Sequence, residues 1–131
     1  MSRRYITVPE VENIHDTVLH QFGGLRGFRD KGLVESAVGR VHTGYYDTNI
    51  FKEAAALMDS LANNHGFIDG NKRTAFVSTD TFLRWNGFYL EVGAKEANDL
   101  ITRAIAEHVF HYDLILEWVF DIHERLDGRR A

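Results

Sequence analysis

The sequence predicts an all-α fold, a compact bundle of about six helices, on three grounds. Apolar residues recur at three- and four-residue intervals over most of the chain, which is the spacing of one helix face. Glycines and helix-capping residue types stand between several of these segments. The 131 residues contain one proline and no low-complexity stretch, so we expect a single domain over residues 1–131 without a linker.

The first helix is predicted to begin after Thr7, because Thr7 and Glu10 have the spacing of a capping box. Apolar residues then follow on one helix face: Val8, Val11, Ile14, Val18, Leu19 and Phe22. The Gly23-Gly24 pair is expected to end this helix. In the loop that follows, Leu25 and Phe28 are expected to anchor the chain by apolar contacts.

Three further helices are predicted in the central part of the chain. Asp30 can cap the second helix, and residues 44–49 form an exposed connection to the third. The third helix is expected from about Ile50 to Asn63. The fourth is expected from about Asn71 to Trp85, where Asn86-Gly87 ends it.

The last part of the chain is predicted to hold two helices. Residues 88–92 are compatible with an extended segment. The fifth helix is expected over about residues 95–108 and the sixth over about residues 113–126, each with apolar residues at helical spacing.

Composition excludes several classes of function. The chain has no cysteine, which excludes disulfides, cysteine-ligated metals and thiol catalysis. A formal net charge of −4 disfavours nucleic acid as a partner, and the apolar runs are too short to cross a membrane. We therefore expect a cytoplasmic protein, and a monomer because the helices can cover one another's apolar faces.

Residues 65–75 carry the polar chemistry of the sequence. A helix that begins near Asn71 directs free backbone N–H groups and its positive dipole end into the preceding loop, which favours an anion. Lys72 and Arg73 add two cations at this helix start. Gly70 has no side chain where a phosphate oxygen would approach the backbone.

Two residues of the same loop add reactive groups. Asp69 supplies a carboxylate suited to Mg²⁺, and His65 belongs to the residue type that exchanges protons near neutral pH. This combination suits the transfer of a phosphate-containing group to a hydroxyl. On composition alone, an ordinary turn with a helix cap and two solvated cations explains the segment as well.

The order of the residues resembles the signature of the Fic/Doc family, His-x-Phe-x-(Asp/Glu)-Gly-Asn-x-Arg. The matching positions are His65, Phe67, Asp69, Gly70, Asn71 and Arg73. Lys72, followed by Thr74-Ala75, is similar to the death-on-curing branch of the family. The resemblance extends to residues 23–38, and it implies a Fic-like helical fold with a loop-to-helix phosphate-binding site.

Two departures from the larger Fic branch, which transfers AMP to protein hydroxyls, set the expected activity. Lys72 replaces a glycine and Phe76 replaces an arginine of that branch. The death-on-curing resemblance implies a toxin that uses ATP and Mg²⁺ to phosphorylate a threonine of elongation factor Tu, which stops translation. AMP transfer to a protein hydroxyl and a catalytically idle binding module are the alternatives. Gly66, where proline is common in Fic proteins, is expected to loosen the loop.

The resemblance implies a role for each matching residue. His65 would act as the general base and Asp69 would hold Mg²⁺. Gly70 and Asn71 would form an amide cradle for phosphate, together with the cations Lys72 and Arg73.

Two kinds of protein partner follow from the same resemblance. Residues 44–49 correspond to the family's target-positioning flap, where Tyr45 and Tyr46 would contact the protein substrate; packing within the protein is the alternative for these tyrosines. No Ser or Thr has Glu four positions later, so the inhibitory helix of many Fic proteins is not present in this sequence. An antitoxin with a disordered tail that folds on binding is implied instead.

Overall fold

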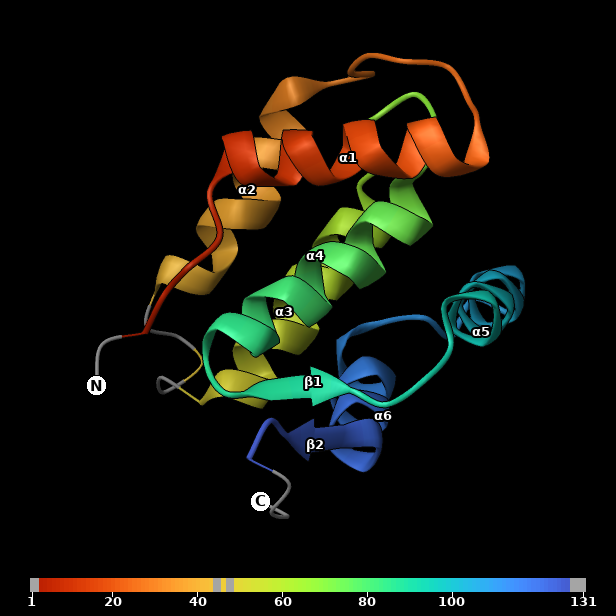
Figure 1. Ribbon diagram of the computed structural model, residues 1–131. Helices are drawn as coiled ribbons and strands as arrows, with labels where there is room; N and C mark the ends of the chain where they lie inside the picture. Colours follow the sequence, from red (N-terminus) through yellow and green to blue (C-terminus); the bar gives the residue numbers. More distant parts are fainter. Residues whose placement is uncertain (1–2, 44–45, 47–48, 128–131) are drawn as a thin grey trace.

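The computed structural model describes residues 3–43, 46 and 49–127 (Figure 1). Within these residues the chain forms six α-helices, one 3₁₀-helix and a two-stranded sheet. The elements are α1 (Val8–Phe22), α2 (Lys31–Arg40), η1 (Val41–Thr43), α3 (Ile50–Asn63), α4 (Asn71–Trp85), β1 (Phe88–Leu90), α5 (Ala94–Ala106), α6 (Tyr112–Ile122) and β2 (His123–Arg125). The all-α prediction is confirmed.

Helices α3 and α4 form the centre of the molecule. They make the most extensive contact between any two elements, and α6, α2 and α1 pack around this pair. Ala54, Ala55 and Ala56 of α3 are fully buried, and such small side chains let neighbouring helices approach closely. From α4, Phe82 and Leu83 fill the same core.

The helix starts that were predicted from capping residues are confirmed. The Thr7 hydroxyl accepts from the Glu10 backbone N–H at 3.4 Å, and the Glu10 carboxylate accepts from the Thr7 backbone N–H at 3.0 Å. Asp30 accepts from the Gly32 N–H at 2.9 Å and so caps α2. These contacts satisfy N–H groups that have no partner inside their own helix.

The prediction for the sixth helix is wrong at its C-terminal end. The helix stops at Ile122, and residues 123–125 form β2, which pairs antiparallel with β1 in the register Phe88↔Arg125 and Leu90↔His123. This pairing satisfies backbone groups of β1 that would otherwise lack partners. The extended segment after α4 is confirmed for residues 88–90.

Two smaller predictions about the surface differ from the structure. Leu25 does not anchor the loop after α1, because 67% of it is exposed, whereas Phe28 packs against the core as predicted. The fifth helix ends at Ala106, before His108 adopts a left-handed backbone with φ 59°.

None of the helices in the described part of the chain is both long and apolar enough to cross a membrane.

Candidate functional site

The N-terminus of α4 differs from the other helix starts. Gly70 precedes it with φ 81°, and its carbonyl accepts the first intrahelical bond, from Thr74 N–H, at 2.9 Å. Among the six α-helices of the described residues, α4 alone has neither a capping side chain nor an acidic residue in its first turn. Its first turn instead carries Lys72 and Arg73.

This arrangement is unfavourable for a helix without a ligand. Cations near a helix N-terminus repel its positive dipole end, and uncapped N–H groups there have no partner within the helix. A bound anion removes both costs, because it accepts from the amides and pairs with the cations. The start of α4 therefore has the chemistry that suits a bound anion.

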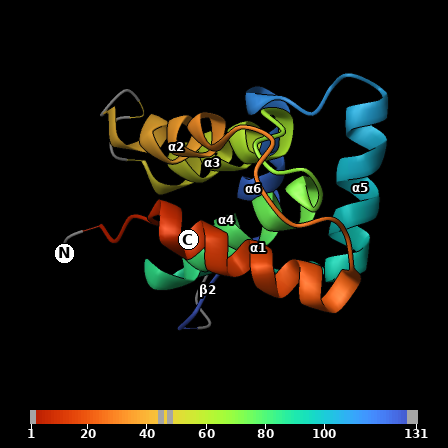
Figure 2. The same ribbon diagram turned by 90° about the horizontal axis from the view of Figure 1, so that it is seen from above.

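The loop before α4 lies against the loop between α1 and α2 (Figure 2). Ile68 N–H donates to the Gly27 carbonyl at 3.1 Å, and Phe28 and Phe67 form an antiparallel bridge. These backbone bonds connect segments that are far apart in the sequence. They restrain the loop of residues 65–70 through contacts outside the loop itself.

Gly66 is a tightly packed position, and the expectation that it loosens the loop is wrong. Its carbonyl accepts from the backbone N–H groups of Arg29 at 2.8 Å and Asp30 at 3.0 Å. A Cβ atom at Gly66 would lie 2.5 Å from the Val34 Cγ2 atom. Glycine is therefore needed at this position because the start of α2 approaches the loop so closely.

Asn71 fixes the loop from within the helix. Its side-chain Oδ1 accepts from the Phe67 N–H at 3.0 Å, and its Nδ2 donates to the Phe67 carbonyl at 2.9 Å. Both ends of the amide are thus used on one residue of the loop. The side chain shapes the loop, and the backbone N–H of Asn71 belongs to the first turn of α4.

Asp69 is held by the α1–α2 loop through one of its two carboxylate oxygens. Leu25 N–H donates to Oδ2 at 2.6 Å, whereas Oδ1 has no hydrogen-bond partner among the described residues. No group of three or more histidine or acidic residues in the described part of the chain could hold a metal ion. A cation at Asp69 would thus need further oxygens from a ligand such as a phosphate, which is the way Mg²⁺ is often bound.

His65 lies at the other end of the loop, with an exposed side chain and a left-handed backbone at φ 52°. Its carbonyl accepts from Arg29 Nε at 2.6 Å, and the same guanidinium donates to the Asn64 carbonyl at 2.9 Å. A left-handed conformation is uncommon outside glycine and is found often at functional sites. The imidazole is accessible to an incoming molecule.

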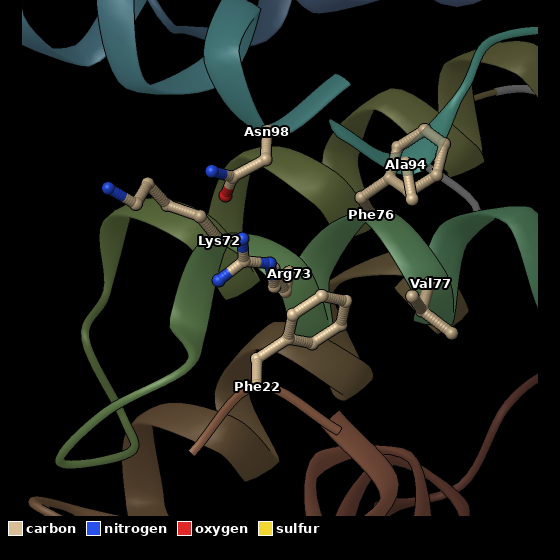
Figure 3. A pocket seen from close by; sticks show the side chains of 7 residues that line it. All are labelled: Phe22, Lys72, Arg73, Phe76, Val77, Ala94 and Asn98. Atoms are coloured by element: carbon tan, nitrogen blue, oxygen red, sulfur yellow. The ribbon is translucent and has the colours of Figure 1, made fainter. Parts of the chain in front are cut away.

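Lys72 and Arg73 line a small hollow together with Phe22 from α1 and Asn98 from α5 (Figure 3). The Arg73 guanidinium lies over the Phe22 ring, 4.0 Å from its centre, whereas the Lys72 ammonium points away from the other labelled side chains. The hollow offers about 20 Å³, room for about one water molecule. The contact with Phe22 holds the Arg73 side chain at the start of α4. The hollow itself is too small to be a nucleotide pocket.

The two residues predicted to form a target-binding flap have different outcomes. Tyr45 lies outside the described residues. Tyr46 is only 6% exposed, and its hydroxyl accepts from Arg40 Nε at 2.6 Å. This burial fits the alternative of internal packing, and a contact of Tyr46 with a protein substrate stays a prediction.

The sequence analysis did not single out His15 on α1. His15 is 3% exposed, its Nε2 lies 2.8 Å from the Asp69 carbonyl oxygen, and its ring stacks on Phe67. The signal that could have found it is its spacing: His15 is four residues after Val11 and three before Val18, on the buried face of α1.

The fold and the site together define a class: a small α-helical protein in which a helix start suited to an anion follows a loop with a histidine and a carboxylate. Comparison of the sequence with protein families identifies the family. The family model described as Fic/DOC family matches residues 5–83, and the chain belongs to this family.

Two relatives share the matching region. The chain is 42% identical over 86 residues to Toxin Doc of Mycolicibacterium smegmatis, an alignment that covers 61% of this chain and 66% of the relative. It is 39% identical over 87 residues to Protein kinase doc of Escherichia phage P1, covering 64% of this chain and 69% of that relative. The chain thus spans about two thirds of the length of each.

Proposed function

We propose that this protein is the toxin of a toxin–antitoxin pair and that it transfers the γ-phosphoryl group of ATP to a hydroxyl of a protein. The observation that carries the proposal is the start of α4. This helix start has no capping side chain and no acidic residue in its first turn, but it carries Lys72 and Arg73. The name of the relative in phage P1, Protein kinase doc, supports this reaction class. The name of the relative in Mycolicibacterium smegmatis, Toxin Doc, supports a toxin.

In the proposed reaction, His65 takes the proton of the acceptor hydroxyl as its oxygen attacks the γ-phosphorus. The bond between the γ-phosphorus and its bridging oxygen breaks, and ADP leaves. The exposed position of His65 lets a protein hydroxyl approach. A positioned general base contributes typically about 10²–10⁴-fold to a rate.

The remaining residues of the site bind and orient phosphates. The N–H groups in the first turn of α4, which begins at Asn71 after Gly70, donate to the negative phosphate oxygens, and Lys72 and Arg73 add positive charge. Asp69 fits Mg²⁺ through its unpaired Oδ1, together with oxygens from ATP. When bound, Mg²⁺ would neutralise charge on the phosphates.

The family resemblance supports a threonine of elongation factor Tu as the acceptor and inhibition of translation in the cytoplasm as the consequence. It also supports an antitoxin whose disordered tail folds on this protein. Three large apolar side chains near the site favour such a partner, because Phe22, Leu25 and Ile68 are 47–67% exposed. Apolar surface of this kind commonly marks a protein-binding surface.

The reaction can be tested by following each phosphate of ATP. The purified protein is incubated with Mg²⁺, elongation factor Tu and ATP labelled at either the γ- or the α-phosphate. We expect label on elongation factor Tu from the γ-phosphate alone, and its loss in His65→Ala and Asp69→Asn. His20→Ala is the matched control, because His20 is an exposed histidine of α1.

Two results would overturn the proposal. Label from the α-phosphate would indicate AMP transfer, the alternative from the larger Fic branch. No label on elongation factor Tu or on any other translation factor, while the protein still binds its partner, would indicate a catalytically idle binding module.

A further inference from the structure

His15 is a buried histidine on α1 that contacts the phosphate-binding loop and lies outside the family signature. We infer that His15 is a positioning residue, which fixes the peptide between Asp69 and Gly70 and so sets the direction of the Asp69 carboxylate and of the first amides of α4. This inference rests on the proposed function for its effect on catalysis. Its structural part can be tested independently.

The hydrogen bond of His15 has a defined direction. A backbone carbonyl oxygen can only accept, so His15 Nε2 must carry the hydrogen that it donates to the Asp69 carbonyl at 2.8 Å. A neutral imidazole meets this requirement when its hydrogen is on Nε2. A glutamine can offer a similar N–H donor, whereas a phenylalanine cannot.

The imidazole ring is itself held by its surroundings. It stacks on the Phe67 ring with centroids 3.7 Å apart and an angle of 11° between the planes. A Cβ atom on Gly70 would lie 3.5 Å from His15 Cδ2, so the ring lies beside the residue that precedes α4. His15 therefore contacts Phe67 and Asp69 and lies beside Gly70.

This contact matters because the backbone torsions at Gly70 have few steric restrictions. Gly70 lacks a Cβ, so its backbone has access to many conformations besides the observed φ of 81°. A change in the backbone torsions at Asp69 or Gly70 would move the Asp69 side chain relative to the start of α4. The bond from His15 holds the Asp69 backbone carbonyl, and the bond from Leu25 N–H to Oδ2 holds the Asp69 carboxylate.

The test compares two substitutions that divide the properties of His15. His15→Phe keeps an aromatic ring for Phe67 but has no donor, and His15→Gln keeps a donor but has no ring. His20→Phe is the control, because His20 is an exposed histidine on the same helix. Thermal unfolding identifies the variants that fold.

The first readout does not depend on catalysis. Amide hydrogen exchange of Leu25 is measured, because this N–H donates to Asp69 Oδ2. We expect faster exchange in His15→Phe and exchange close to wild type in His15→Gln and His20→Phe. In the wild-type protein, ¹⁵N spectra of the ring are expected to show hydrogen on Nε2. Hydrogen on Nδ1 alone, or unchanged exchange in folded His15→Phe, would overturn the inference.

The second readout is binding of Mg·ATP by calorimetry, with kcat and KM where transfer is observed. Loss of a partner that orients a metal ligand commonly costs about 10–100-fold in affinity or activity. We expect a loss of this size in His15→Phe and a smaller one in His15→Gln. Equal losses in both folded variants would contradict positioning by the hydrogen bond. If wild type transfers no phosphate but the exchange results hold, the proposed function fails and the positioning role stands.

Discussion

Individual residues of the loop before α4 are fixed by contacts with distant parts of the chain. Gly66 touches Val34 of α2, Asp69 accepts from Leu25, and the His65 carbonyl accepts from Arg29. Each of these contacts removes a freedom that the loop would have as an isolated segment. The geometry of the site therefore depends on α1, α2 and their connection as much as on α4.

Adding a methyl group at Gly66 should destabilise the protein. In Gly66→Ala the new Cβ would meet Val34 Cγ2 at 2.5 Å, and overpacking of this kind costs about 1–3 kcal/mol in the free energy of unfolding. Urea unfolding measures the loss. In the double variant with Val34→Ala, part of the clash is removed, so the two effects should not add. Strict additivity would show that this contact does not limit the position.

Lys72 is expected to determine which phosphate is transferred. It stands in the first turn of α4, where the larger Fic branch has glycine. Lys72→Gly removes a long cationic side chain from the place that an α-phosphate would need. The ratio of α-label to γ-label on the acceptor protein should therefore rise. An unchanged ratio in an active, folded variant would contradict crowding by Lys72.

The sequence pointed to candidate reactive residues but not to the residues that contact them from other elements. His65, Asp69 and Lys72 belong to a short segment with a recognisable order. His15 and Arg29 reach this segment across separations of 54 and 36 residues, and no local pattern records such contacts. These positioning residues became evident only when the packing of α1 and of the α1–α2 loop was known.

At the scale of elements, predictions succeeded where the determining interaction is local. The start of α1 depends on a bond between Thr7 and Glu10, and the start of α4 follows from Gly70 and the apolar pattern after it. The end of α6 depends instead on β1, which lies more than thirty positions earlier in the chain. Apolar spacing continues past Ile122, so the sequence favoured a longer helix there.

The capping box of α1 should make stability depend on pH. Burial raises the pKa of Glu10, but hydrogen bonds from Thr7 and the charge of Arg4 lower it more, so the pKa lies below its ordinary value of 4.5. As pH falls, the unfolded chain therefore takes up this proton first. The stabilisation is complete above pH 4.5 and is lost as pH falls through the pKa of the folded state.

Glu10→Gln tests this dependence. At neutral pH the variant should be less stable by about 0.5–1 kcal/mol, because a partly exposed pair and one cap contribute little more. Urea unfolding at several pH values should show the difference shrinking below pH 4.5. Glu35→Gln, at an exposed position of α2, is the control and should show a much smaller difference. A constant difference at all pH values would contradict the role of the Glu10 charge.

At the scale of the whole molecule, α1 and the α1–α2 loop lie across one end of the α3–α4 pair (Figure 1). Ala94 and Asn98 of α5 line the hollow beside Arg73 of α4. The Fic/DOC model ends at residue 83, so α5, α6 and the small sheet lie beyond the matched region. Phe22 of α1 and Asn98 of α5 stand on opposite sides of Arg73 (Figure 3). Helix α5 thus contributes to the surroundings of the family site.

Expression of the protein should stop the growth of a bacterial host. The proposed phosphorylation of elongation factor Tu would block translation, so incorporation of labelled amino acids should fall before growth stops. His65→Ala, produced at the same level and folded, should leave both unchanged. Growth arrest that persists in His65→Ala would show that the effect does not arise from the proposed reaction.

The most direct test of the central claim is to locate phosphate binding on the protein. Backbone amide resonances are followed by NMR while inorganic phosphate, and then Mg·ATP, is added to the ¹⁵N-labelled protein. We predict saturable shifts that are largest for Asn71, Lys72 and Arg73 in the first turn of α4. Shifts centred elsewhere, or none at these amides, would contradict an anion site at the start of α4.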